Sequence, residues 1–267
     1  MMAGTGGEIP SEGFVTSLCR EAGRVSLRRW GGSLQVTQKG AVDLVTDVDL
    51  ALEELIREAV TRRFPEHTIL SEERGQDETA PQADYVWMVD PLDGTTNYVH
   101  GHPVFCISVG LLYRGECLLG CVYDPLRDEL FYAAHGKGAT LNGNQIAVSG
   151  TDILISSLLS TGFPYERATI DESNVTQLGK LIDRIQGVRR SGSLALDLAY
   201  VAAGRLDGHW EFHVKPWDTA AGGLLVKEAG GRVSGVELEQ WTPFASDIVA
   251  TNGRIHEDLL AALRQNG

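Results

Sequence analysis

Hydrophobic residues recur every three or four positions in two segments near the start of the chain. Residues 12–30 and 50–64 both show this spacing. It places the apolar side chains on one face, so each segment is predicted to form an amphipathic helix. Residues 36–49, between them, are expected to form a loop that leads into the second helix.

The middle of the chain changes to short apolar runs that are typical of strands. Strands are predicted over residues 69–70, 86–89, 106–113, 117–123 and 129–133. Short polar stretches that contain Gly or Asp separate the last three runs and resemble hairpin turns. The pattern therefore indicates an antiparallel meander and not a series of βαβ units.

The second half of the chain alternates between the two periodicities. Strands are predicted over residues 157–160, 208–212 and 248–251, and helices over 171–186, 193–203, 217–229 and 255–263. This order predicts an α+β architecture with layered helices and sheets. We expect a flexible tail over residues 1–10, then an N-terminal lobe over 11–150 and a C-terminal lobe over 151–267, joined in one compact globule.

Composition and charge narrow the function. The net charge of -13 argues against general nucleic-acid binding, and it would repel an anionic substrate unless bound metal ions reverse the local field. No apolar run approaches the ~20 residues of a membrane-spanning helix. The four cysteines lie in apolar stretches without a complete zinc-binding pattern. They are expected to be buried thiols, in keeping with a reducing cytoplasm.

The most informative segment runs from Val86 to Asn97. A buried strand is predicted to stop at Asp90, Pro91 stiffens the turn that follows, and Asp93 brings a second carboxylate. The next four residues, 94–97, supply a flexible bend, hydroxyls and backbone N–H groups that favour an anion. Two fixed carboxylates repel each other unless a cation lies between them, and Mg²⁺ prefers oxygen ligands of this kind. The segment therefore predicts a metal-dependent phosphoryl site.

Three further carboxylates lie at the ends of predicted elements. Asp49 and Asp218 open helices, and Glu72 follows a strand. Each also has an ordinary interpretation, because acids favour helix starts and loops are often charged. The hypothesis of a site requires the fold to bring all of these carboxylates together.

Four motifs, in order along the chain, resemble those of one family. Asp90-Pro91-Leu92-Asp93-Gly94-Thr95-Thr96-Asn97 closely resembles the signature of the inositol monophosphatase family. Residues 217–222, continuing to 228–231, look like its second signature, and residues 43–49 and 71–73 match two more of its segments. The resemblance covers about residues 12–262. It implies a layered αβαβα sandwich of the inositol monophosphatase/fructose-bisphosphatase type, and a lithium-sensitive, Mg²⁺-dependent phosphomonoesterase that is often a homodimer.

The resemblance also implies a role for each carboxylate. Glu72, Asp90 and the backbone carbonyl of Leu92 would hold a first Mg²⁺, and Asp90 would bridge to a second Mg²⁺ that Asp93 and Asp218 complete. Glu72 would also support a weaker third ion through water.

Other residues of the same motifs would act on the reactants. Asp49 with Thr95 would orient and deprotonate the attacking water. The N–H groups of Gly94 and Thr95 would hold the phosphate. No serine or cysteine nucleophile is expected.

The sequence says less about which residues would bind the alcohol part of the substrate. Glu211 matches a position that holds an inositol hydroxyl in the family, although a strand-end surface acid is an alternative. Asp93 and Asp218 are further candidates for hydroxyl contacts. Ser193 and Leu194 align with a wall of small residues in the sugar pocket, and Leu194 is bulkier than the alanine often found there.

Two basic segments keep two interpretations each. Lys39 would lie in a mobile loop over the metal ions or face solvent. Arg189 and Arg190 would meet a second phosphate or form a solvated basic turn.

The resulting prediction is the hydrolysis of inositol monophosphate, or of a related sugar-alcohol phosphate, to the free alcohol and phosphate. Histidinol phosphate, fructose 1,6-bisphosphate, adenosine 3′,5′-bisphosphate and NADP(H) remain alternative substrates. A regulator that binds a protein or RNA partner on the same fold is the alternative of a different class.

Overall fold

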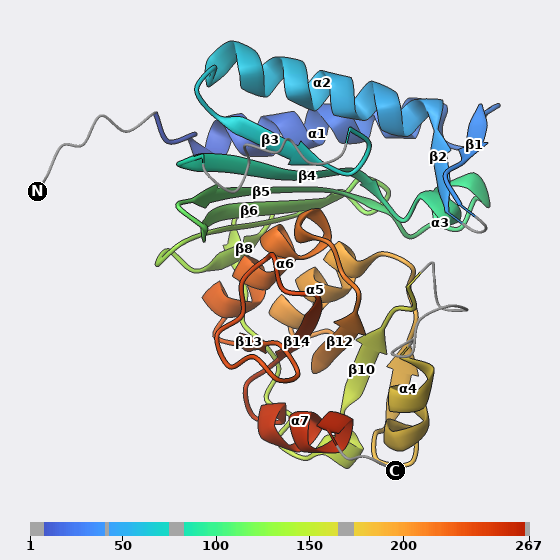
Figure 1. The fold of residues 1–267 in the computed structure, drawn as a ribbon, viewed down its shortest axis with the longest axis vertical. Coiled ribbons are helices and arrows are strands. Elements are labelled where there is room, and N and C mark those ends of the chain that lie inside the picture. The colour runs from blue at the N-terminus through green and yellow to red at the C-terminus, as the bar shows by residue number, and fades with distance from the viewer. Residues whose placement is uncertain (1–7, 41–42, 75–82, 165–173, 265–267) are drawn as a thin grey trace, which may run out of the picture.

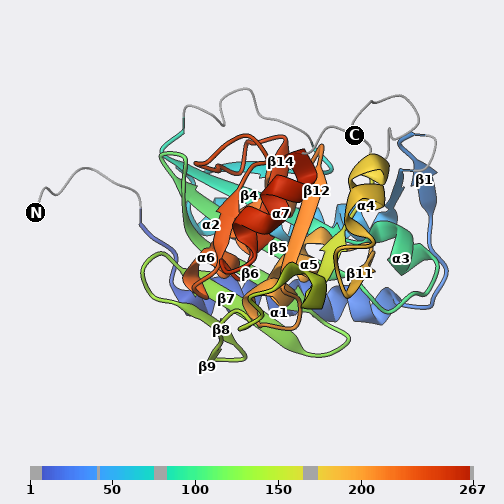
Figure 2. The same ribbon diagram turned by 90° about the horizontal axis from the view of Figure 1, so that it is seen from below.

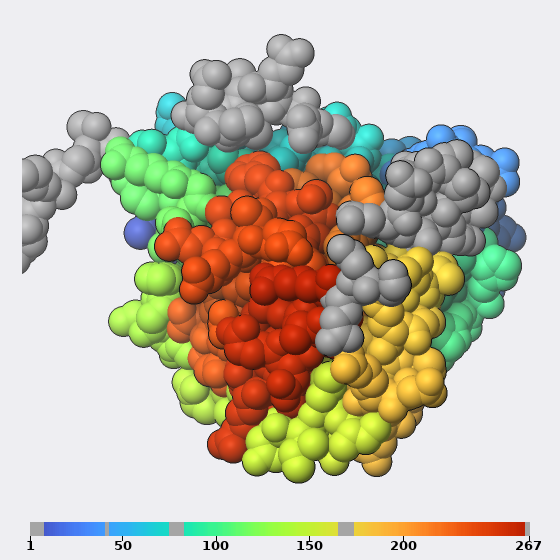
Figure 3. Space-filling model, turned by 60° about the horizontal axis from the view of Figure 1, so that its bottom comes forward, coloured from blue at the N-terminus to red at the C-terminus, as the bar shows by residue number. Residues whose placement is uncertain are grey.

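Five layers of helix and sheet alternate through the molecule (Figure 1). The computed structural model describes residues 8–40, 43–74, 83–164 and 174–264. Helices α1 (Glu12–Arg29) and α2 (Asp47–Arg63) cover one face of a larger sheet, and α5 (Leu194–Ala202) and α6 (Pro216–Glu228) separate this sheet from a smaller one. Helices α4 (Val175–Leu181) and α7 (His256–Arg264) cover the outer face of the smaller sheet (Figures 2 and 3). The predicted αβαβα sandwich is confirmed.

Most of the larger sheet is the predicted meander. Within the described ranges it has seven strands, in the order β3 (Thr68–Ser71), β4 (Tyr85–Asp93), β5 (Cys106–Tyr113), β6 (Glu116–Asp124), β7 (Glu129–Ala134), β8 (Ala139–Leu141) and β9 (Asn144–Gln145). Strands β3 and β4 are parallel, and each later pair is antiparallel. The apolar runs of the sequence therefore became neighbouring strands in chain order.

The smaller sheet mixes parallel and antiparallel pairs. Its strands in the described part of the chain follow the order β11 (Gly187–Arg189), β10 (Leu158–Thr161), β12 (Gly208–Phe212), β14 (Asp247–Thr251) and β13 (Arg232–Ser234). Strand β10 runs parallel to β11 and β12, whereas β14 runs antiparallel to β12 and β13. The carboxyl ends of β10 and β12 consequently lie next to each other, and this places Gly162 beside Glu211.

Four hydrophobic clusters of described residues hold the layers together, the smallest of them joining β3, β4 and β5 to Ala220 of α6. The first joins α1 and α2 to the larger sheet through residues such as Leu18, Leu52 and Trp87. The second fills the space around α5 and α6, and the third joins the smaller sheet to α7. Burial of apolar surface on both faces of each sheet makes the relative positions of the layers rigid.

Helix α6 approaches the larger sheet unusually closely. A Cβ atom added to Gly120 in β6 would lie 2.8 Å from the Cα and the carbonyl oxygen of Ala221, and one added to Gly110 in β5 would lie 3.1 Å from the Cβ of Ala220. The absence of side chains at these two strand positions lets the helix backbone rest on the sheet. This contact fixes the first turn of α6, which carries Asp218, against the end of β4.

The sequence prediction was wrong about two segments: the stretch between the first two helices and the end of β4. Residues 36–49 are not a plain loop: β1 (Val36–Gln38) and β2 (Leu44–Thr46) form an antiparallel hairpin, and α2 already begins at Asp47. The strand predicted to stop at Asp90 continues to Asp93, with an irregular register between the two aspartates. Pro91 lies in this bulge, where a missing N–H disturbs the ladder least.

The prediction also overestimated one helix and missed several short elements. Helix α4 covers only Val175–Leu181 of the predicted 171–186, and residues 165–173 lie outside the described part of the chain. Val175 and Ile182 are exposed, whereas Gln177 and Leu181 are buried. Elements that the sequence reading did not identify are β8, β9, β11, β13, α3 (Thr95–Val99) and the 3₁₀ helix η2 (Leu154–Ser156).

Two further predictions concern the chain as a whole. In the described ranges, no helix combines the length and apolar character that crossing a membrane requires. All four cysteines are free, and Cys117 is less buried than the other three. The tail predicted over residues 1–10 lies mostly outside the described residues, and the division into lobes near residue 150 stays a prediction.

The close contact of α6 with the larger sheet leads to the first testable prediction. Gly120→Ala should lower the free energy of unfolding by about 1–3 kcal/mol, because the added methyl group meets helix backbone that cannot move aside. Chemical denaturation measures the change. Gly150→Ala is the matched control, since a Cβ there has nothing within 4 Å. An equal change in both variants would contradict the close-packing account.

Candidate active site

A cavity of about 270 Å³ lies where the end of β4, the first turn of α6 and the end of β12 meet. It brings together ten of the eleven predicted site residues: Glu72, Asp90, Leu92, Asp93, Gly94, Thr95, Ser193, Leu194, Glu211 and Asp218. The eleventh, Asp49, is not part of the lining and lies behind Thr95, to which it is hydrogen bonded. Lys39, Arg190 and His213 also line the cavity, whereas Arg189 does not.

The bulge in β4 explains why Asp90 and Asp93 both reach the cavity. Asp90 pairs with Ser108 of β5, and Asp93 pairs with Cys106, so three steps on β4 match two steps on β5. In a regular strand, residues three apart point to opposite faces. The extra residue reverses this alternation, and both carboxylates line the same cavity.

Asp93 links the strand to helix α5. Its Oδ2 accepts hydrogen bonds from Ser193 Oγ and from the N–H of Ala195, both at 2.7 Å, and Cys106 Sγ lies at 3.6 Å. These donors favour the ionised carboxylate, but burial outweighs them and raises the pKa of Asp93. Cys106, expected to be an ordinary core thiol, therefore lies at the base of the site.

The pKa values of Asp90 and Asp218 are raised by burial and by the negative charges of the other acids in the cluster. Burial raises the pKa of Asp90 well above its usual value, and the negative charges of Glu72, Asp93 and Asp218 raise it further. Asp218 shows the same direction for the same reasons, although its Oδ2 accepts a hydrogen bond of 3.0 Å from the Lys215 N–H. Without a cation, these side chains resist being ionised together.

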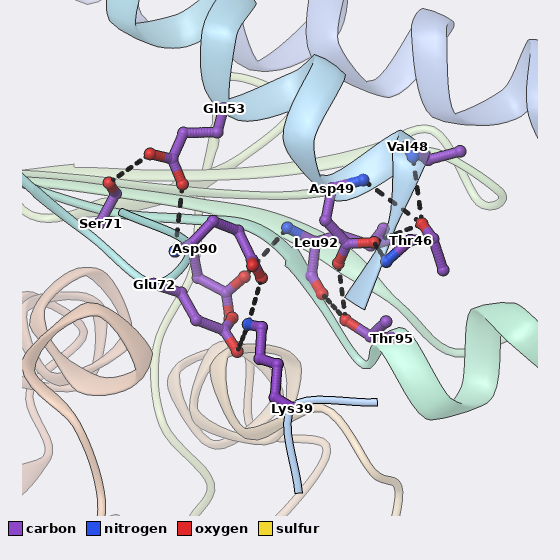
Figure 4. Close-up of polar contacts among 11 residues, drawn as sticks. Lys39, Thr46, Val48, Asp49, Glu53, Ser71, Glu72, Asp90, Leu92 and Thr95 are labelled. Atoms are coloured by element: carbon purple, nitrogen blue, oxygen red, sulfur yellow. Dashed lines mark hydrogen bonds and ion pairs between the residues drawn. The ribbon is translucent and has the colours of Figure 1, made fainter. Parts of the chain in front are cut away.

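Glu72 is held beside Asp90 by contacts on both of its sides (Figure 4). Its backbone N–H donates to Val89 O at 3.2 Å, which continues the β3–β4 pairing. Lys39 Nζ lies 3.4 Å from its Oε1 and 2.6 Å from Glu73 Oε1. Burial raises the pKa of Glu72 to about 7, even though Lys39 opposes the shift. Lys39 therefore reaches the carboxylates while the residue stays partly open to solvent.

Glu53 of α2 anchors the turn that presents Glu72. It is buried, and its Oε1 accepts from Ser71 Oγ at 2.8 Å while its Oε2 accepts from the Glu73 N–H at 3.1 Å. Ser71 and Glu73 flank Glu72 on the chain. Glu53 is thus bonded to the side chain before Glu72 and to the backbone after it. Figure 4 shows Glu72 next to Asp90.

A second group of hydrogen bonds joins the start of α2 to the start of α3. Asp49 Oδ1 accepts from Thr95 Oγ1 at 2.8 Å, and Asp49 Oδ2 accepts from the N–H of Thr46 at 2.9 Å and from its hydroxyl. Thr95 Oγ1 also lies 3.0 Å from Leu92 O. Burial raises the pKa of Asp49, whereas the hydrogen bonds from Thr46 and Thr95 oppose the shift. Asp49 thus both caps α2 and orients the Thr95 hydroxyl.

Gly94 makes the turn between these groups. Its φ of 99° lies in the left-handed region, and it is the N-cap of α3. A Cβ atom there would meet Val104 O at 3.0 Å and Gly192 O at 3.3 Å. A glycine is required for both reasons, and its turn carries the chain from the aspartates of β4 to Thr95.

The sequence reading missed the residues that support the site from behind. Thr46, Glu53 and His209 are buried and polar, and each bonds or faces a predicted site residue or its neighbour. Asp197, also buried and missed, lines the cavity itself. The Thr46-to-Asp49 spacing is a capping-box pattern that would have identified Thr46. The other three act across long sequence separations and leave no local pattern.

The donor set suits a hard divalent cation. It combines four carboxylates with a backbone carbonyl, all oxygen ligands, and the carboxylates repel one another in its absence. Over the described residues, no group of three or more His, Cys, Asp or Glu side chains stands as a ready-made metal site. Lys39 engages Glu72, and Thr95 Oγ1 lies 3.0 Å from Leu92 O, so a few side chains would have to rotate before these oxygens could complete a metal site.

Comparison with known sequences identifies relatives along the whole chain. The sequence model of the inositol monophosphatase family matches residues 11–267. An inositol-1-monophosphatase of Synechocystis sp. is 48% identical over 253 residues, which are 94% of this chain and 87% of that protein. The Nus factor SuhB of Escherichia coli strain K12 is 40% identical over 257 residues, which are 96% of both chains.

Comparison with solved structures agrees with the fold. An inositol monophosphatase from Anabaena (Nostoc) sp. PCC 7120 matches with a TM-score of 0.86 and 43% identity, covering 96% of this chain and 95% of the other. An IMPase/NADP phosphatase in complex with Mg²⁺ and phosphate matches with a TM-score of 0.85 and 26% identity, covering 96% of this chain and 95% of the other.

The raised pKa of Glu72 makes a prediction for the metal-free protein. Because its pKa is about 7 in the folded chain against 4.5 in the unfolded one, folding favours the neutral carboxyl group, and stability falls as the pH rises between these values. Glu72→Gln keeps a neutral side chain. Its free energy of unfolding relative to the wild type should therefore rise between pH 5 and 8, by up to about 3 kcal/mol.

Denaturation in EDTA at several pH values measures this difference. Glu129→Gln is the control, since the hydrogen bond from Arg205 lowers the pKa of Glu129 and its replacement should bring no gain at high pH. A Glu72→Gln variant whose relative stability stays constant with pH would contradict the electrostatic account.

Proposed function

The chain belongs to the inositol monophosphatase family and is a phosphomonoester hydrolase, and on this basis we propose that it is a Mg²⁺-dependent phosphatase that hydrolyses inositol monophosphate. The observation that supports this most is the cluster of Glu72, Asp90, Asp93 and Asp218 around one cavity. Burial and neighbouring negative charges raise the pKa of all four, so added positive charge would favour their ionised forms. Bound divalent cations would supply that charge and attract a phosphate in spite of the net charge of -13.

The proposed ligands fall into two overlapping sets. Glu72, Asp90 and the Leu92 carbonyl would hold one Mg²⁺, while Asp90, Asp93 and Asp218 would hold another, with a third ion near Glu72. When bound, such ions lower the pKa of water and offset the charge on the phosphoryl oxygens. The solved relative that holds Mg²⁺ and phosphate supports this choice of cation.

The residues of the chain would orient the reactants around these ions. The Asp49 carboxylate holds the Thr95 hydroxyl, and this pair would position the attacking water and accept its proton. The N–H groups of Gly94 and Thr95, at the turn into α3, would bind the phosphate oxygens. A covalent phosphoenzyme is not needed, since the pair activates water directly.

The substrate proposal depends on the opposite wall of the cavity. Glu211, Ser193 and Leu194 line it, and a carboxylate next to neutral side chains suits the hydroxyl groups of a polyol. The volume of about 270 Å³ suits a small phosphate ester. The name of the Synechocystis relative supports inositol 1-phosphate within this class.

Other substrates of the same chemistry remain measurable rivals. The solved relative named as an NADP phosphatase makes NADP one of them, alongside histidinol phosphate, fructose 1,6-bisphosphate and adenosine 3′,5′-bisphosphate. Arg190 lines the cavity, and it is the candidate for contact with a second phosphate. A rate comparison across these substrates at equal Mg²⁺ ranks them directly.

A second role is suggested by the Nus factor SuhB relatives. We propose that any such role in this chain is additional to catalysis, because the complete carboxylate set is retained. Binding of a protein or RNA partner by a catalytically inactive variant would demonstrate it. We also propose a cytoplasmic homodimer that lithium inhibits, and the family membership supports each of these.

Phosphate release provides the test of the proposed function. The wild type should release phosphate from myo-inositol 1-phosphate with Mg²⁺ and not with EDTA. Asp93→Asn should lower kcat by at least roughly 100-fold, because it removes one charge from the proposed ion site while keeping the shape of the side chain. Its melting temperature should remain close to that of the wild type.

Asp84→Asn is the matched control, since Asp84 is an exposed carboxylate paired with Arg114. Near-normal kcat in Asp93→Asn would overturn the ligand assignment. Phosphate release that is unaffected by EDTA would overturn the metal-dependent mechanism.

A further inference from the structure

A buried histidine lies directly behind the carboxylate of Glu211. The side chain of His209 is 0% exposed, and that of Glu211 is 15% exposed. His209 Nε2 lies 3.4 Å from Glu211 Oε2, and it has no hydrogen bond to any described residue. A fully buried ring nitrogen without a partner is costly, so its position next to a carboxylate oxygen requires an explanation.

The opposite nitrogen of the ring determines which tautomer fits. His209 Nδ1 lies 2.9 Å from Ser160 Oγ, close enough for the hydroxyl to donate to it. Asp197 Oδ2, at 3.8 Å from the same nitrogen, is too far for a hydrogen bond. If Nδ1 accepts from Ser160, then Nε2 carries the proton and points it at Glu211. The other tautomer would set a lone pair against a carboxylate oxygen in a buried place, which is repulsive.

The other side of the Glu211 carboxylate is fixed by backbone. A Cβ atom added to Gly162 would lie 2.2 Å from both carboxylate oxygens. The carboxylate therefore rests against Gly162 and has His209 behind it. Asp93 and Asp197 both feel the negative charge of Glu211, so the surrounding acids tend to push it away.

We propose that His209 is a positioning residue for the specificity of the phosphatase: its Nε2–H, oriented by Ser160, holds one oxygen of Glu211 so that the other oxygen accepts a hydroxyl of the polyol. The inference rests on the proposed function for its substrate. The 3.4 Å separation is long for a hydrogen bond, and such bonds in ligand-free sites commonly shorten when substrate binds.

Kinetics with two substrates test the proposal. Inositol 1-phosphate offers hydroxyls to Glu211, whereas p-nitrophenyl phosphate has none on its leaving group. His209→Phe should raise KM for inositol 1-phosphate by about 10-fold, with kcat changed by no more than about 2-fold. Without His209, the Glu211 carboxylate is no longer held in place, and its hydrogen bond to the substrate hydroxyl weakens. KM for p-nitrophenyl phosphate should stay within about 2-fold. His209→Gln, which retains an N–H donor, should recover most of the loss.

A double-mutant cycle separates positioning from general packing. If His209 acts through Glu211, then His209→Phe should have no further effect on KM in the Glu211→Gln background. If the fold-increase in KM of the double variant equals the product of the two single increases, the proposal is overturned. Equal increases in KM for both substrates in His209→Phe would also overturn it. Ser160→Ala provides the same test if His209→Phe does not fold, since loss of the hydroxyl that orients His209 should raise KM for inositol 1-phosphate selectively.

A readout that does not depend on the substrate keeps the two proposals apart. In the wild type, the ¹⁵N resonances of His209 should show the Nε2–H tautomer, and the Nε2 resonance should shift in Glu211→Gln. An Nδ1–H tautomer, or no shift, would overturn the positioning role whatever the enzyme hydrolyses. If the tautomer is as expected but inositol 1-phosphate is not hydrolysed, the substrate proposal alone fails.

Discussion

The crowding of four buried or half-buried carboxylates around one cavity is the constraint on which the rest of this structure depends. Glu72, Asp90, Asp93 and Asp218 come from three separate parts of the chain, and burial is the main cause that raises the pKa of each. Repulsion from the other members raises the pKa of Asp90 and Asp218 further, while other nearby acids add to the shift at Glu72 and Asp93. Such a cluster costs stability unless a cation relieves it. The layered hydrophobic core offsets the stability that the carboxylate cluster loses. The same unfavourable clustering favours the binding of a metal ion at the site.

Three local devices hold the acids in place. The bulge in β4 brings Asp90 and Asp93 into one cavity, and glycines on β5 and β6 let α6 carry Asp218 onto the sheet. Glu53 is hydrogen bonded to the side chain of Ser71 and to the backbone N–H of Glu73, on either side of Glu72. Behind the opposite wall, His209 and Gly162 confine Glu211 in a comparable way. Rigid support of this kind is what a site for oriented reactants requires.

The sequence predicted the regular elements of this fold because their periodicity is local. The helices at 12–30 and 217–229 and the meander from 106 to 133 followed from spacing alone, and the family motifs identified the residues that line the cavity. The β1–β2 hairpin is local, but each strand has only three residues and β1 is exposed throughout, so neither strand shows a clear apolar pattern. The bulge at Pro91 depends on the pairing of β4 with β5, which lies later in the chain. His209 and Asp197 likewise have partners that come close only after folding.

A calorimetric titration of the metal-stripped protein with Mg²⁺ tests the central claim most directly. In two buffers of different ionisation enthalpy near pH 7, the account predicts that Mg²⁺ binding releases protons, because carboxyl groups with raised pKa values must ionise to become ligands. Asp90→Asn should reduce both the binding and the proton release. Mg²⁺ binding without proton release, or no binding to the wild type, would contradict the account.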